Sequence, residues 1–217
     1  MNKILEVNNL TFAYEDRAIL DGFTCSMNEG DFVGIIGRNG AGKTTLLNLI
    51  LGNLKKYKGE IKLFGDNIKG NNHLDDISYI SQSAVSAYKN FPTTISECLK
   101  INLRRLKKNI DADQMLKDLD LYDHKNKRLS ELSGGQLQKL GILLALIKDS
   151  DFIILDEPTN NIDPAFTYEL LEILTKLKNE GKTILMVTHN MEITNKYLDY
   201  VFKVEKGRCE VIDARNV

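Results

Sequence analysis

The amino-acid sequence predicts an α/β protein in which a parallel sheet covered by helices is joined to an antiparallel layer of strands and to an inserted helical subdomain. Continuous apolar segments at 32–36, 152–155 and 183–187 are each followed by a polar or glycine-rich turn and then by a helical pattern. Such uniformly apolar strands are typical of parallel sheets that are buried on both faces. The first third of the chain instead alternates polar and apolar residues, and the middle third has helical spacing.

The antiparallel layer is predicted from short alternating segments. Polar and apolar residues alternate along 4–9, 11–14 and 23–27, and 60–65 forms a further short strand that ends in a turn signal. A period of two is the pattern of strands with one face buried and one face exposed. We therefore expect these segments to pair with one another beside the first buried strand.

The helical subdomain is predicted from the absence of any convincing strand pattern between 87 and 150. Thr94 and Glu97 form a capping-box sequence, and apolar residues recur at helical spacing after it. Asp111 is a candidate N-cap for a second helix. The chain is thus predicted to be one domain in three parts, with an α/β core and β-layer over about 1–86 and 151–217, and the helical subdomain over about 87–150.

The amino-acid composition limits the kinds of protein that this chain can be. The 217 residues are 42% hydrophobic, which is enough for one large domain with a sizeable core. Lys plus Arg total 29, Asp plus Glu total 30, and the formal net charge of −1 argues against a protein that coats nucleic acid through bulk charge. Cys25, Cys98 and Cys209 lie far apart with no CxxC pair, so we expect idle thiols in a reducing cytosol.

The sequence also predicts a soluble, cytosolic chain. Its longest apolar run, residues 140–147, is too short to cross a bilayer. At the N-terminus, Glu6 comes too early for a signal peptide. If the protein works at a membrane, we expect another subunit to hold it there.

A phosphate-binding pattern follows the first buried strand. The segment Gly37-Arg38-Asn39-Gly40-Ala41-Gly42-Lys43-Thr44 fits G-x-x-x-x-G-K-[ST] and opens a helix through 46–50. Glycines let the backbone curl, so that N–H groups and the helix N-terminus face phosphate oxygens. We expect Lys43 to reach the β- and γ-phosphates of a nucleotide and the Thr44 hydroxyl to bind Mg²⁺. The alternative is a chance turn with a surface lysine, which the flanking strand and helix disfavour.

Two acidic residues end the apolar segment 152–155. Asp156 at the strand tip can complete the environment of Mg²⁺, and Glu157 could take a proton from an attacking water. Unpaired carboxylates beside a buried strand are costly without a cation or water. A solvated loop pair is the alternative, and the phosphate loop elsewhere in the chain disfavours it.

The segment Leu132-Ser133-Gly134-Gly135-Gln136 precedes a predicted helix at about 138–146 and lies upstream of the Asp156 strand. This arrangement closely resembles the ATP-binding cassette family, whose signature is LSGGQ, and the resemblance covers essentially the whole chain. It implies a P-loop NTPase fold with a RecA-like core. It also implies a transport-coupled ATPase that uses ATP and Mg²⁺.

The resemblance assigns further roles. It implies that the ring of Tyr14 stacks on adenine and that the ATP-binding residues are Tyr14, Gly37, Arg38, Asn39, Gly40, Ala41, Gly42, Lys43, Thr44 and Thr45. It implies a Mg²⁺ environment of Thr44, Gln82 and Asp156, and a catalytic set of Lys43, Gln82, Glu157 and His189. Outside this context Tyr14 would be taken as core packing and His189 as a structural histidine, and the order of the motifs favours the functional roles.

A second binding surface is implied for another copy of the chain. Residues Ser133, Gly134, Gly135 and Gln136 resemble a second anion-binding nest at a helix N-terminus, whereas one ATP needs only one cradle. In the family, two chains enclose two ATP molecules head to tail, so the resemblance implies a homodimer with an isologous interface. Asn161 and Asp163 match the loop that crosses this interface. Lys139 stands where an arginine is usual, which puts helix contacts in doubt but not catalysis.

The partner class is suggested by a short segment after Gln82. Residues 91–95, Phe-Pro-Thr-Thr-Ile, resemble a step found in ATPases of zinc and manganese importers. The implied partners are two membrane permease subunits and an extracellular substrate-binding protein, with this chain on the inner face of the membrane and no nucleic acid. Because His73, His124 and His189 have no ligand spacing, we expect the metal not to touch this chain.

Other functions remain open at this point. The chain could serve another importer, or an exporter of small molecules, peptides or lipids. It could also be a non-transport ATPase of DNA repair or translation, or a regulator that binds nucleotide without hydrolysing it. The basic clusters at 55–58 and 104–108 are expected to be solvated surfaces, and contact with anionic lipid head groups is the alternative.

Overall fold

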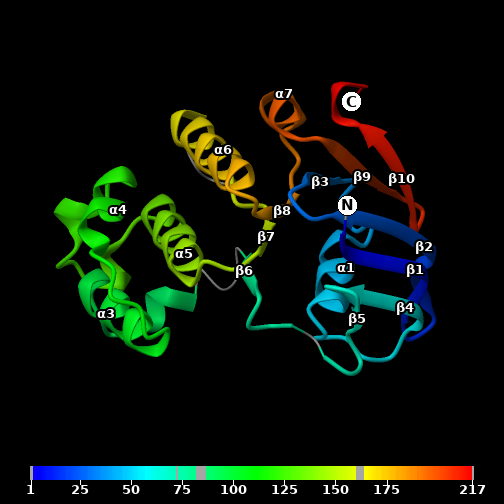
Figure 1. The fold of residues 1–217 in the computed structure, drawn as a ribbon, viewed down its shortest axis with the longest axis horizontal. Coiled ribbons are helices and arrows are strands. Elements are labelled where there is room, and N and C mark those ends of the chain that lie inside the picture. The colour runs from blue at the N-terminus through cyan, green and yellow to red at the C-terminus, as the bar shows by residue number, and fades with distance from the viewer. Residues whose placement is uncertain (1, 72, 82–86, 160–163, 217) are drawn as a thin grey trace.

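The computed structural model describes residues 2–71, 73–81, 87–159 and 164–216, and their strands form two sheets. The first sheet has the order β2-β1-β4-β5 and contains β1 (Lys3–Tyr14), β2 (Arg17–Asn28), β4 (Lys58–Leu63) and β5 (Asp66–Asn67). The second has the order β10-β9-β3-β8-β7-β6 and contains β3 (Phe32–Ile36), β6 (Ile77–Ser81), β7 (Phe152–Asp156), β8 (Thr183–Val187), β9 (Tyr200–Glu205) and β10 (Arg208–Asp213). Helices lie mainly on the side of β6, β7 and β8 (Figure 1).

The first sheet confirms the predicted antiparallel layer. β1 pairs antiparallel with β2 on one side and with β4 on the other. The predicted segments 4–9 and 11–14 form one continuous strand, because an irregular register between Val7 and Phe12 absorbs the break in alternation. Asn9 adopts a positive φ of 48° at this bulge.

The second sheet confirms the three predicted buried strands as β3, β7 and β8, and all three pair in parallel. Alternate residues of β7 enter two different hydrophobic clusters: Ile153 and Leu155 pack towards the helices, whereas Phe152 and Ile154 pack towards the first sheet. Burial on both faces explains why this strand is uniformly apolar. The carboxyl ends of these parallel strands therefore meet at one edge of the sheet.

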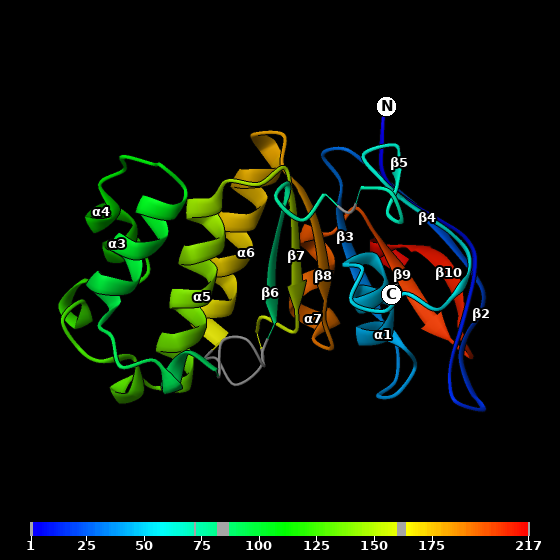
Figure 2. The ribbon, with the colours of Figure 1, turned by 90° about the horizontal axis from the view of Figure 1, so that it is seen from below.

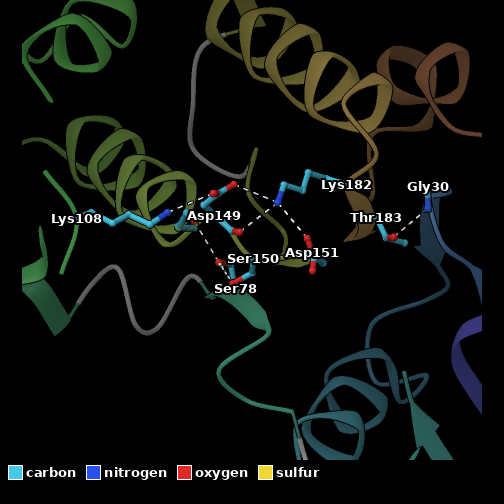
Figure 3. A network of polar contacts seen from close by, with 9 residues as sticks. Gly30, Ser78, Lys108, Asp149, Ser150, Asp151, Lys182 and Thr183 are labelled. Carbon is cyan, nitrogen blue, oxygen red and sulfur yellow. Dashed lines mark hydrogen bonds and ion pairs between the residues drawn. The ribbon is translucent and has the colours of Figure 1, made fainter. Parts of the chain in front are cut away.

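The sequence does not predict four strands, β5, β6, β9 and β10. In β6 the serines interrupt the apolar pattern although Ser78 and Ser81 are buried. The hydroxyl of Ser78 donates to the carbonyl of Ala145 at 3.1 Å and lies 3.0 Å from the hydroxyl of Ser150 (Figure 3). Hydrogen bonds of this kind allow polar side chains inside a buried strand.

Most helices cover one face of the second sheet or extend away from it, whereas α1 (Lys43–Ile50) packs on the other face, in the same hydrophobic cluster as the first sheet. The others are α3 (Ile95–Arg105), α4 (Ala112–Asp118), α5 (Gly134–Lys148), α6 (Pro164–Asn179) and α7 (Met191–Thr194). α5 and α6 lie beside β6, β7 and β8, and α3 and α4 lie beyond α5, away from both sheets (Figures 1 and 2). None of the described helices is both long and apolar enough to cross a bilayer.

The helix starts agree with their capping sequences. The N–H of Glu97 donates to the Thr94 hydroxyl at 3.2 Å, and the Glu97 carboxylate accepts from the N–H of Thr94 at 2.9 Å, which confirms the predicted start of α3. The side chain of Asp111 caps α4, as predicted. The prediction of a helix start at about 138 was wrong, because Ser133 and Gln136 form a second capping box and α5 begins at Gly134.

A polar network joins the helical subdomain to the second sheet (Figure 3). Asp149, directly after α5, pairs with Lys108 of the helical subdomain at 3.3 Å and with Lys182, directly before β8, at 3.1 Å. Lys182 also pairs with Asp151 at 3.1 Å. The backbone at Asp149 is left-handed, with φ 61°, so the chain turns sharply from α5 into β7.

Candidate functional site

The phosphate loop, residues 37–42, connects β3 to α1 and has the strand–loop–helix context that its sequence predicts. Three of its residues, Gly37, Gly40 and Gly42, have positive φ values of 153°, 77° and 105°. At Gly37 a Cβ atom would lie 2.5 Å from the carbonyl oxygen of Val204 in β9. Only glycine fits this close approach, so the packing of β9 against the loop helps to fix the loop's curvature.

Lys43 begins α1 and its side chain turns back into the loop. It is 6% exposed, and its ammonium group donates to the carbonyl oxygens of Gly37 at 2.9 Å and Arg38 at 3.3 Å. Burial lowers the pKa of Lys43, and the nearby carboxylates of Glu157 and Asp156 partly oppose this shift. The ammonium group is therefore held between the loop and the two carboxylates.

A cavity of about 400 Å³ opens beside the loop. It is lined by Tyr14, Arg17, Ile19, Asn39, Gly40, Gly42, Lys43, Thr44, Thr45 and Glu157. The ring of Tyr14 is 47% exposed and packs edge-on against Phe12, with 4.8 Å between ring centroids. The cavity lining thus includes both an exposed aromatic ring, which suits a nucleotide base, and Lys43, which suits phosphates.

A larger cavity of about 820 Å³ lies between the loop, the start of β2 and the turn between β9 and β10. It shares Arg17, Ile19, Asn39 and Gly40 with the smaller cavity. Lys43, Thr44 and Glu157 line only the smaller one. Because Lys43, Thr44 and Glu157 are the groups predicted to act on phosphates, the smaller cavity is the candidate phosphate site.

Asp156 ends β7 and is 9% exposed. Burial raises its pKa, and repulsion from the Glu157 carboxylate raises it further, whereas Lys43 and hydrogen bonds from the hydroxyls of Tyr79 and Thr44 oppose the shift. Carboxylate and hydroxyl oxygens are the ligands that Mg²⁺ prefers. The pairing of Thr44 with Asp156 therefore fits the predicted magnesium site.

Glu157 and His189 meet at the carboxyl ends of neighbouring parallel strands. His189 Nε2 lies 2.7 Å from Glu157 Oε1, and the N–H of Glu157 donates to the carbonyl of Val187 at 3.2 Å. Glu157 has a positive φ of 54°, which is uncommon for a residue with a side chain. Such conformations are concentrated at functional sites, where the surrounding structure over-determines them. The structure thus brings together two residues of the predicted catalytic set, the base Glu157 and His189.

The predicted signature residues lie apart from this cavity. Ser133 caps α5: its hydroxyl accepts from the N–H of Gln136 at 3.2 Å, and its N–H donates to the Gln136 side chain at 3.0 Å. A Cβ atom at Gly134 or Gly135 would have nothing within 4 Å among the described residues. None of these four residues lines the cavity beside the phosphate loop. They therefore form an open helix N-terminus rather than a wall of their own chain's site.

Three predicted site residues, Gln82, Asn161 and Asp163, lie outside the described residues. In contrast, Tyr79 was not predicted, although its hydroxyl interacts with Asp156. Burial and Asp156 raise the pKa of Tyr79 to about 12, so the phenol stays protonated as a donor. The signal that could have found Tyr79 is the pairing of β6 with β7, which sets it opposite Ile154.

Comparison with known proteins decides the family. The family model described as "ABC transporter" matches residues 20–160. The chain belongs to the ABC transporter family. It is an ATP-binding cassette ATPase, and the resemblance in its sequence motifs is confirmed.

Two relatives and one solved structure illustrate how far the similarity of this ABC ATPase extends. The zinc uptake system ATP-binding protein ZurA of Listeria innocua is 36% identical over 216 residues, which cover 95% of this chain and 84% of ZurA. The manganese transport system ATP-binding protein MntB of Bacillus subtilis is 32% identical over 98% of this chain and 88% of its own length. A nucleotide-free ATP-binding cassette from an ABC transporter superposes with a TM-score of 0.79 at 27% identity, covering 95% of this chain and 89% of that one.

Replacing Asp156 with asparagine is expected to raise the melting temperature of the nucleotide-free ABC ATPase at pH 7 and to lower its ATPase activity. Because the folded-state pKa is raised, Asp156 contributes most to stability below the ordinary aspartate pKa, and this contribution is lost as pH rises through the folded-state pKa. The ionised group is therefore unfavourable at pH 7, and each kcal/mol recovered raises Tm by about 2–4 °C.

Thermal melts of wild type and Asp156→Asn at several pH values measure this effect. The difference in Tm should shrink as pH falls below about 4, where aspartate is protonated in either state. Asp123→Asn, at an exposed carboxylate of the helical subdomain, is the matched control and should leave Tm unchanged. A lower Tm for Asp156→Asn at pH 7 would show that its hydrogen bonds outweigh its burial.

Proposed function

We propose that this ABC ATPase is the ATP-hydrolysing subunit of a metal-ion importer of the zinc or manganese type. The observation that carries the proposal is that relatives named for zinc uptake and manganese transport match nearly the whole chain, at 36% and 32% identity. The segment 91–95 supports the same class, and its residue Phe91 is 59% exposed in the loop that leads to α3. An exposed aromatic at this point is available to a partner subunit.

The proposed hydrolysis uses the groups gathered at the phosphate loop. Lys43 and the loop N–H groups hold the β- and γ-phosphates, and the ring of Tyr14 supports the adenine. Thr44, Asp156 and Gln82 would hold Mg²⁺, which when bound would neutralise negative charge on the phosphate oxygens. Glu157 Oε accepts the proton of the attacking water, and His189, 2.7 Å from it, fixes the orientation of the carboxylate.

A second copy of the chain completes each site in this proposal. Residues 133–136 end in an open helix N-terminus that does not line their own chain's cavity. The first N–H groups of a helix favour anions, so this end of α5 suits the γ-phosphate of an ATP held by the partner copy. Two chains arranged head to tail would then enclose two ATP molecules, with the 160–163 segments at the interface.

The proposed partners outside this chain are two membrane permease subunits and an extracellular substrate-binding protein. The ABC ATPase would then lie at the inner face of the membrane. No group of three or more His, Cys, Asp or Glu side chains suited to a metal ion occurs among the described residues. In the proposal the transported metal passes through the permease.

Deleting the gene in its own organism tests the proposed function. We expect cell zinc or manganese, measured by inductively coupled plasma mass spectrometry in chelator-treated medium, to fall several-fold. Wild type should restore the metal content and Lys43→Ala should not, whereas Lys176→Ala, at an exposed lysine of α6, should restore it as wild type does. Unchanged zinc and manganese with a defect in the uptake or efflux of another solute would contradict the metal-importer proposal.

A further inference from the structure

The outermost strands of the two sheets lie side by side and each carries a cysteine. Cys25 belongs to β2 and Cys209 to β10, which are the end strands of the first and second sheets. β10 comes close to β2 in both views (Figures 1 and 2). The N–H of Asp21 donates to the carbonyl of Gly207 at 2.9 Å, and Arg208 pairs with Asp21 at 3.5 Å. The strands are therefore tied together a few residues before each cysteine.

The two sulfur atoms are neighbours. The thiol of Cys25 is hydrogen-bonded to Cys209, and both residues pack in the hydrophobic cluster that joins the two sheets. Cys25 is 5% exposed, whereas Cys209 is partly exposed. This hydrogen bond, together with burial, raises the pKa of Cys25 well above its ordinary value. Cys25 is therefore a weak nucleophile behind a more accessible thiol.

We propose that Cys25 and Cys209 form a reversible intramolecular disulfide when the folded protein meets a low-molecular-weight disulfide such as oxidised glutathione. Two thiols that interact across neighbouring strands meet the first requirement of disulfide geometry, which is proximity of the two side chains. The third cysteine provides an internal contrast. Cys98 is buried in α3, and its sulfur accepts a hydrogen bond from the side-chain amide of Asn102 rather than interacting with another cysteine.

The reaction proceeds by two exchange steps. The thiolate of Cys209 attacks one sulfur of oxidised glutathione, so that a mixed disulfide forms and one glutathione thiolate leaves. The sulfur of Cys25 then attacks Sγ of Cys209, its proton passes to the departing second glutathione, and the Cys25–Cys209 bond forms. Two protein thiols are oxidised, and one oxidised glutathione is reduced to two glutathione molecules. Excess reduced thiol reverses both steps.

The cross-link would close a loop from residue 25 to residue 209, which is most of the chain. Closing so long a loop restricts the unfolded chain strongly, so we expect Tm to rise by about 5–15 °C on oxidation. The bond would also fix β2, whose first residues, Arg17 and Ile19, line the nucleotide cavity, to the edge of the second sheet.

Intact-mass measurement and peptide mapping of the folded full chain test this proposal, with oxidised glutathione as the probe. Wild type should lose two hydrogen atoms, gain no glutathione, and yield a peptide that links Cys25 to Cys209 and disappears with dithiothreitol. Cys98→Ser should behave as wild type. Cys25→Ala should retain one glutathione on Cys209, because the resolving thiol is gone, and Cys209→Ala should show no modification at buried Cys25.

Two outcomes would overturn the proposal without involving transport or ATPase activity. A wild-type chain that stops at a glutathione adduct on Cys209 would show that the two sulfurs cannot join. A chain whose three thiols all survive oxidised glutathione, while a surface cysteine introduced at Lys176 reacts under the same conditions, would show that the pair is not a reactive dithiol.

Discussion

Replacing Glu157 with glutamine is expected to lower ATP turnover by about 10²–10⁴-fold while leaving ATP binding intact. Glutamine keeps the length of the side chain but cannot accept the proton of the attacking water. The contact with His189, 2.7 Å from Glu157 Oε1, can still form through the amide. Lys43, Thr44 and Tyr14, which are expected to hold the nucleotide, are untouched.

Steady-state phosphate release and equilibrium binding of ATP to the purified protein measure the two effects separately. Glu172→Gln is the matched control, because Glu172 is an exposed carboxylate on α6, away from the cavity. Its turnover should equal that of wild type. If Glu157→Gln turned over ATP at the wild-type rate, Glu157 would not be the base, and another group would have to take the proton.

The second large effect is expected when two inactive variants are mixed. Lys43→Ala removes the ammonium group from the phosphate loop, and Gly135→Asp places a carboxylate at the open N-terminus of α5. A Cβ atom at Gly135 would have nothing within 4 Å among the described residues. A negative charge in the first helical turn interacts favourably with the helix dipole. Gly135→Asp should therefore fold normally yet repel a γ-phosphate presented by a partner copy.

In a head-to-tail dimer, one mixed pair contains one intact site and one site with both defects. Random mixing of equal amounts should therefore restore about a quarter of the wild-type turnover, because half of the dimers are mixed and each has one good site of two. Phosphate release from each variant alone and from the mixture measures this. Full turnover by Gly135→Asp alone, or no recovery on mixing, would contradict the proposal that two chains build each site.

Much of the fold follows from local patterns that the sequence shows directly. The apolar strands β7 and β8 are uniformly buried, β3 is buried except at its last residue, and the start of α3 is set by its capping box. β6 escapes prediction because Ser78 is a buried polar residue whose partners, Ala145 and Ser150, come from elsewhere in the chain. Partners of this kind cannot be read from the strand itself.

In the candidate site, too, some residues were predicted from local sequence and others depend on contacts between distant segments. Lys43, Asp156, Glu157 and His189 were predicted from their motifs, and the structure brings them together at one edge of the sheet. Tyr79 reaches Asp156 only because β6 pairs with β7.

The proximity of two cysteines is a further feature that could not be predicted from the sequence. Cys25 and Cys209 are distant in sequence and were expected to be idle thiols. Only the meeting of two end strands puts their sulfurs in contact.

The ion pairs of Asp149 with Lys108 and Lys182 have a practical consequence for measurements on this protein. The Asp149 side chain is 60% exposed, so dissolved ions screen both pairs, and each contributes at most about 1 kcal/mol. The attachment of α3 and α4 to the sheet thus becomes looser as electrolyte is added. Comparisons of turnover between variants should accordingly be made at one fixed ionic strength, since buffer composition alone can alter the freedom of that attachment.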